Sequence, residues 1–89
     1  MHDFLADDDK RTLLTLARLA IRSRLFGETP EWPGCGPALH QRHGAFVTLH
    51  AHGNLRGCIG HMNADMELCT VIRSMALAAA FEDPRFLPL

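Results

Sequence analysis

The stretch Leu55-Arg56-Gly57-Cys58-Ile59-Gly60 decides the fold of this chain and carries its candidate site. It alternates apolar and polar or small residues, as expected for a half-buried strand. Residues 44–51 precede it and are rich in β-branched and aromatic side chains, which favour strands. The turn-forming sequence His52-Gly53-Asn54 separates the two runs. The sequence therefore predicts a β-hairpin over residues 44–60.

The register of this hairpin follows from side-chain alternation. If His52-Gly53-Asn54 forms the loop with Asn54 left-handed, Ala51 pairs with Leu55 and Val47 pairs with Ile59. This alignment places His50 opposite Arg56 and Thr48 opposite Cys58. One predicted face holds Val47, Leu49, Ala51, Leu55 and Ile59, and the other holds Phe46, Thr48, His50, Arg56 and Cys58. A shift of one residue would mix the two sets.

Two helices flank the hairpin. Apolar residues recur at helical spacing over residues 6–26, after a start rich in Asp, and again over residues 65–82, where Asp65 is the predicted N-cap. Residues 28–43 contain repeated Pro and Gly and predict a loop, in which Trp32 is expected to cover an edge of the core. The predicted fold class is α+β: a helix, a long loop, a β-hairpin and a second helix packed on an antiparallel sheet.

Length and composition limit the classes of protein that fit. A hydrophobic content of 47% indicates a globular chain, and a net charge of -1 gives no electrostatic reason to expect nucleic acid. No apolar run approaches the roughly 20 residues that a membrane span needs. The cysteines at positions 35, 58 and 69 form no CxxC motif, so free thiols in the cytoplasm are expected.

Completeness of the domain is a separate question. Two strands make a poor sheet by themselves, and the sequence ends on the apolar residues Phe86-Leu87-Pro88-Leu89. We therefore expect residues 1–89 to be the N-terminal part of a single larger domain. The apolar end also predicts homo-oligomerisation or aggregation of this part alone.

The candidate site centres on Cys58. A nearby cation favours the reactive thiolate, and Arg56 stands two residues before Cys58, where it could also bind an anion. His50 would act across the hairpin as a base or as a group that orients the thiol, with Thr48 beside the thiol. Gly57 and Gly60 would allow a ligand to approach the backbone. The favoured interpretation is a binding site for a small molecule, peptide or partner protein centred on residues 55–60. The alternatives are an enzyme that uses Cys58 as a nucleophile or substrate contact, and a buried cysteine that acts as a small hydrophobe.

Metal and nucleic-acid sites are weaker interpretations. His50, His52 and His61 are suitable zinc ligands together with Cys58, but their spacing matches no recognised zinc motif, so no metal or other cofactor is expected. Arg56, Arg73 and Arg85 do not form a basic run with interleaved aromatic residues, so nucleic-acid binding by this part is not expected.

Three stretches resemble the AMMECR family, named after a human chromosomal region linked to Alport syndrome, midface hypoplasia and elliptocytosis. They are residues 44–49, the motif Leu55-Arg56-Gly57-Cys58-Ile59-Gly60, and residues 78–86. The resemblance implies an α+β domain of two unequal subdomains, roughly twice this length, whose biochemical role is not settled. It also implies association with Memo-like and radical-SAM proteins in a modification pathway, or a role linked to nucleic acids or translation. His61-Met62-Asn63 departs from the family pattern.

Overall fold

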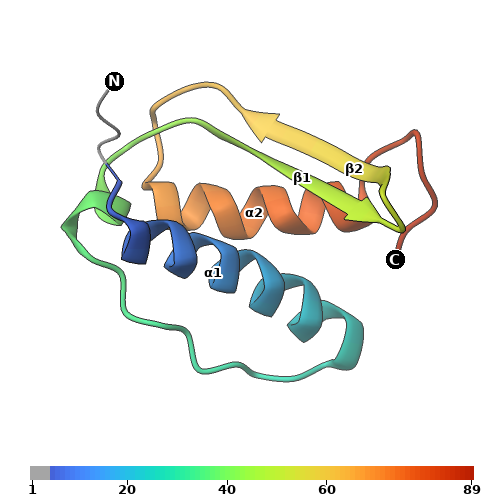
Figure 1. The fold of residues 1–89 in the computed structure, drawn as a ribbon, viewed down its shortest axis with the longest axis horizontal. Helices are drawn as coiled ribbons and strands as arrows, with labels where there is room; N and C mark the ends of the chain where they lie inside the picture. The colour runs from blue at the N-terminus through green and yellow to red at the C-terminus, as the bar shows by residue number, and fades with distance from the viewer. Residues whose placement is uncertain (1–4) are drawn as a thin grey trace.

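The computed structural model describes residues 5–89, which form two helices, one short 3-10 turn and a β-hairpin. Figure 1 shows helix α2 lying against the hairpin on one side and against α1 on another, so that α2 is the central element. The predicted α+β class is confirmed. In chain order the elements are α1 (Asp7–Phe26), η1 (Pro37–His40), β1 (Ala45–Ala51), β2 (Asn54–His61) and α2 (Leu68–Phe81).

The core forms where α2 meets α1 and the inner face of the hairpin. Its buried side chains come mainly from α2, with Leu16 and Ala20 from α1, Leu39 from η1 and Val47 from β1. The alanine side chains of α2 are small, so a strand can approach the helix closely. A Cβ atom built at Gly57 would lie 2.1 Å from the carbonyl oxygen of Ala79, so only glycine fits at that point of β2.

The hairpin register agrees with prediction at one end and differs at the turn. Val47 pairs with Ile59 and Thr48 with Cys58, as predicted. The predicted Ala51–Leu55 pair is wrong, because Ala51 pairs with Asn54. The turn consists of His52 and Gly53 alone, with positive φ angles of 53° and 78°. Positive φ at both central residues of a two-residue turn matches the right-handed twist of the strands better than a type I or type II turn would.

A bulge in β2 explains why the pairs far from the turn match the prediction although the turn is one residue shorter than predicted. Leu49 pairs with Gly57 and His50 pairs with Leu55, which leaves Arg56 as the extra residue. The predicted His50–Arg56 pair is therefore wrong. The bulge keeps Val47, Leu49 and Ile59 against the core and transfers Leu55 to the outer face, where it is 42% exposed.

The helix boundaries also differ from the predicted ranges. Helix α2 begins at Leu68 with Glu67 as its N-cap, three residues later than the predicted start at Asp65. Glu67 instead forms an isolated antiparallel bridge with Arg42 of the loop, and the N–H of Leu68 donates to the carbonyl of Gln41. Helix α1 ends at Gly27, whose φ of 66° makes it a left-handed C-cap. No helix within residues 5–89 is long and apolar enough to cross a membrane.

Candidate binding surface around Cys58

The backbone of Cys58 is fixed by the segment that follows α2. The Asp83 carboxylate accepts hydrogen bonds from the Cys58 N–H at 3.0 Å and from the backbone N–H, Nε and Nη2 of Arg85 at 3.1, 3.0 and 2.8 Å. Arg85 Nη2 also donates to the carbonyl of Cys58 at 3.4 Å. Residues 83–85 thus hold both backbone polar groups of Cys58, and we call this arrangement the Asp83–Arg85 clamp.

The electrostatics of the clamp favour its charged form. Asp83 is only 4% exposed, yet the hydrogen bonds from Arg85, and then the one from the Cys58 N–H, hold the pKa of its carboxyl well below the usual range. The hydrogen bonds to Asp83 and its negative charge in turn raise the pKa of Arg85 above its ordinary value. A buried carboxylate that keeps its charge fixes the geometry of β2 at Cys58 throughout the neutral pH range.

The Cys58 side chain lies on the outer face of the hairpin beside Thr48. Its sulfur is 3.3 Å from the Thr48 hydroxyl, which is the hydrogen-bond partner of the thiol within residues 5–89. His50 is on the same strand as Thr48, but the bulge places it opposite Leu55. The structure therefore brings Thr48 to Cys58 as predicted, and it shows no contact between an imidazole and the thiol among the described residues.

The Arg56 side chain interacts with the residues that follow α2. Its Nη2 donates to the carbonyl of Leu87, and its guanidinium carbon lies 5.7 Å from the centre of the Phe86 ring. Arg56 Nη1 is buried and has no hydrogen-bond partner in the described part of the chain. The side chain that was expected to bind an anion beside Cys58 instead contacts residues 86–87.

The two glycines of the motif occupy crowded positions on opposite faces of β2. Gly57 faces α2, as described above, whereas Gly60 lies beneath the Phe46 ring, whose nearest atom would be 2.2 Å from an added Cβ. Gly57 is required because its neighbour is backbone, whereas an added Cβ at Gly60 would displace the Phe46 side chain. Because Phe46 lies flat across Gly60 and remains 62% exposed, the outer face of the hairpin presents an aromatic surface next to Thr48 and Cys58.

The histidines within residues 5–89 do not gather into a metal centre. His61 interacts with Asp65 at 2.6 Å, and this hydrogen bond lowers the pKa of the Asp65 carboxyl below its ordinary value. His50 and His52 are exposed at the turn end of the hairpin. No group of three or more His, Cys, Asp or Glu side chains that could hold a metal ion occurs within residues 5–89.

An apolar groove adjoins the outer face along β1. It has a volume of about 320 Å³ and runs between β1 and α1. Phe46 belongs to both the outer face and the groove, and Leu14 from α1 is 56% exposed at the groove. Sequence patterns did not predict this groove because it depends on how α1, β1 and α2 are placed relative to one another. Its lining residues are Lys10, Leu13, Leu14, Ala17, Phe46, Val47, Thr48 and Ile72.

Comparison with known proteins gives the family. The chain is 42% identical over 87 residues to a protein of Methanothermobacter thermautotrophicus and 42% identical over 90 residues to a protein of Methanosarcina barkeri. In both cases 96% of this chain is covered and 45% of the relative. The chain thus spans a little under half the length of these curated relatives.

A solved structure shows the same fold. The crystal structure of the uncharacterised protein PH0010 from Pyrococcus horikoshii superposes with a TM-score of 0.84 at 34% identity, over 96% of this chain and 45% of that one. The sequence pattern of the AMMECR1 family matches residues 14–89, which include the whole hairpin, α2 and the Asp83–Arg85 clamp. On these grounds the chain belongs to the AMMECR1 family.

Proposed function

We propose that the outer face of the hairpin, formed by Phe46, Thr48, Leu55 and Cys58, is a binding surface for a partner protein. The observation that carries the proposal is the apolar exposure of this face, with Phe46 62% and Leu55 42% exposed beside the Thr48–Cys58 pair. The inner face is already used, since it packs on α2. Exposed aromatic and aliphatic side chains grouped on a rigid surface are typical of protein interfaces.

The rigidity of the surface supports binding rather than catalysis. The Asp83–Arg85 clamp holds the N–H and the carbonyl of Cys58, so the strand cannot shift easily at its centre. The sulfur of Cys58 is beside the Thr48 hydroxyl, and the nearby Arg85 guanidinium is already paired with the Asp83 carboxylate. A nucleophilic cysteine requires a base or an available cation at its sulfur, which supports binding rather than catalysis. We therefore assign Cys58 the role of a contact residue on a preorganised surface.

The shape of the surface favours an extended, apolar segment of the partner. Strand β1 pairs only with β2 among the described residues, so its other edge offers backbone groups next to the apolar groove. A segment added along such an edge gains main-chain hydrogen bonds, while alternate side chains enter the groove. The family resemblance supports a Memo-like or radical-SAM protein as the partner, and a shared modification pathway as the setting.

The test compares two phenylalanines of equal exposure. Phe46 is 62% and Phe26 is 63% exposed, and only Phe46 belongs to the proposed surface. Titration calorimetry with a purified Memo-like protein is expected to show binding that Phe46→Asp weakens by at least about tenfold, or roughly 1.4 kcal/mol. Phe26→Asp is expected to bind like the unmodified chain. Equal affinities for the two variants would refute the assignment of this surface.

A substitution at Cys58 separates a binding surface from an enzyme. Cys58→Ser keeps the size and hydrogen-bonding capacity of the side chain but removes the thiol. We expect the affinity for the Memo-like partner to change by less than about threefold, because no bond to sulfur forms. A reaction in the mixture that proceeds with Cys58 and stops with Cys58→Ser, in a variant that remains folded by circular dichroism, would establish the catalytic alternative instead.

A further inference from the structure

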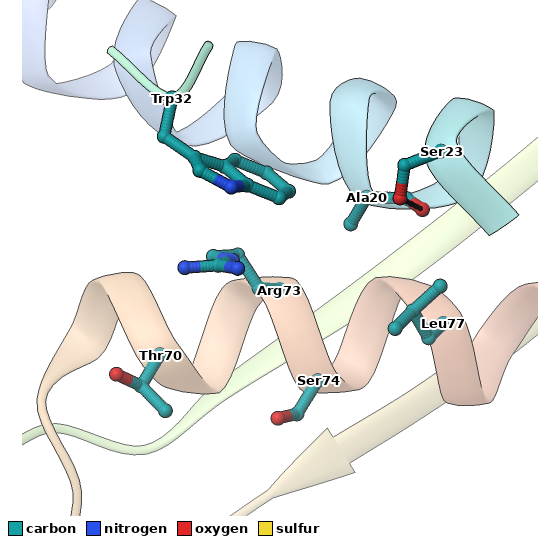
Figure 2. Close-up of a pocket in the computed structure, with 7 residues that line it drawn as sticks. All are labelled: Ala20, Ser23, Trp32, Thr70, Arg73, Ser74 and Leu77. Carbon is teal, nitrogen blue, oxygen red and sulfur yellow. Dashed lines mark hydrogen bonds between the residues drawn. The ribbon is translucent and has the colours of Figure 1, made fainter. Parts of the chain in front are cut away.

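A second pocket lies between α1 and α2 and shares no residue with the hairpin surface. It has a volume of about 330 Å³, within the range of small-molecule sites. Figure 2 shows Trp32 reaching from the loop over the space between the helices, with Arg73 of α2 lying beneath the indole ring. Ser23, Ala20 and Leu77 line the other end of the pocket.

Arg73 is held in place by stacking. Its guanidinium carbon lies 3.7 Å from the centre of the Trp32 ring, the shortest such contact within residues 5–89. The other arginines stacked on aromatic rings in this part of the chain lie between 5.1 and 5.7 Å from them. A guanidinium in face contact with an indole keeps the N–H groups at its edge available for an anion.

The charge of Arg73 is not balanced by a carboxylate in the described residues. Arg11, Arg22 and Arg85 each form an ion pair with an acidic side chain, whereas Arg73 forms none within residues 5–89. The described residues that line the pocket include no Asp or Glu. A cation that is fixed in position, lacks a local counter-charge and lines a pocket is a suitable receptor for an anionic ligand.

The remaining polar groups of the pocket are hydroxyls. Thr70 and Ser74 stand three residues before and one residue after Arg73 on α2, and Ser23 lies on α1. The Ser23 hydroxyl donates to the carbonyl of Ala20, whereas Thr70 and Ser74 form no side-chain hydrogen bond within residues 5–89. Figure 2 shows the Thr70 and Ser74 hydroxyls pointing away from the Arg73 guanidinium, so Arg73 is the group of this pocket that would bind an anion.

We propose that this pocket binds the phosphate group of a small molecule. Arg73 binds the phosphate oxygens through the edge of its guanidinium, which can donate two parallel hydrogen bonds to a phosphate group. Trp32 fixes the guanidinium and excludes water from one of its faces. The apolar end of the pocket at Ala20 and Leu77 receives the carbon skeleton of the ligand. This proposal does not depend on the hairpin surface.

The single tryptophan of the chain makes the proposal directly measurable, because Trp32 is itself part of the site. Inorganic phosphate is titrated at constant ionic strength while the Trp32 emission is recorded. We expect a saturable change in emission. Arg73→Met should raise the apparent dissociation constant at least about tenfold, since it removes the charged donor and leaves a side chain of similar length.

Arg24→Met is the matched control. Arg24 also stacks on an aromatic ring, that of Phe81 at 5.1 Å, but it does not line the pocket. Its phosphate titration should match that of the unmodified chain. The proposal is overturned if phosphate produces no saturable change, if Arg73→Met and Arg24→Met respond alike, or if acetate at the same ionic strength saturates the signal at lower concentration than phosphate.

Discussion

Replacing Gly57 with alanine tests how closely β2 approaches α2. The added Cβ would lie 2.1 Å from the Ala79 carbonyl oxygen and 2.9 Å from its carbonyl carbon. Ordinary contact begins at 3.4 Å, so the strand and the helix would have to separate by about 1.3 Å. Both groups are backbone and cannot rotate away. We expect Gly57→Ala to lower the free energy of unfolding by about 2–3 kcal/mol, the upper part of the range for overpacking.

Urea denaturation followed by circular dichroism measures this change, and Gly34→Ala provides the control. Nothing lies within 4 Å of a Cβ at Gly34, and its φ is not in the left-handed region. This variant should stay within about 0.5 kcal/mol of the unmodified chain or gain slightly from a less flexible unfolded state. If Gly57→Ala proves as stable as Gly34→Ala, the close approach of β2 to α2 is not a determinant of the fold.

Three further predictions concern charge and the turn. The pKa of Asp83 is depressed in the folded state, so the carboxylate contributes its full stabilisation above the ordinary pKa of 3.8 and loses it as the pH falls below that value. The difference in free energy of unfolding between the unmodified chain and Asp83→Asn should therefore narrow below pH 3.8 in denaturation experiments. His61→Ala should raise the pKa of Asp65 in a carbon NMR titration, and an unchanged value would exclude the hydrogen bond as its cause. His52 adopts a φ of 53°, a conformation that Asn tolerates better than His, so His52→Asn should raise the free energy of unfolding by up to about 1 kcal/mol. A lower free energy of unfolding for this variant in urea denaturation would contradict the turn geometry.

The sequence was sufficient for the fold class and for half of the hairpin. Alternation of apolar residues set the pairs Val47–Ile59 and Thr48–Cys58, because only that alignment buries one face. The turn could not be derived in the same way. Which residues take positive φ depends on strand twist, and the bulge at Arg56 compensates for a turn one residue shorter than predicted.

The candidate site was predictable in its centre but not in its surroundings. The motif identified Cys58 and its neighbour Thr48, since both follow from the register. The hydrogen bond from the Cys58 N–H to the Asp83 carboxylate joins residues 25 positions apart, so no local sequence pattern predicts it. Trp32 was expected to cover an edge of the core, and stacking on Arg73 adds a polar pocket that only the packing of the two helices creates.

Alkylation of the three cysteines with and without a Memo-like partner tests the central claim most directly. Cys58 lies on the proposed surface, whereas Cys35 lies in the loop and Cys69 lies on α2, so the latter two serve as internal references. Peptide mass spectrometry on the native protein follows each rate separately. The account predicts that saturating partner slows alkylation at Cys58 by at least about tenfold and leaves the other two rates unchanged. An unchanged rate at Cys58 in a complex shown to be formed by calorimetry would contradict it.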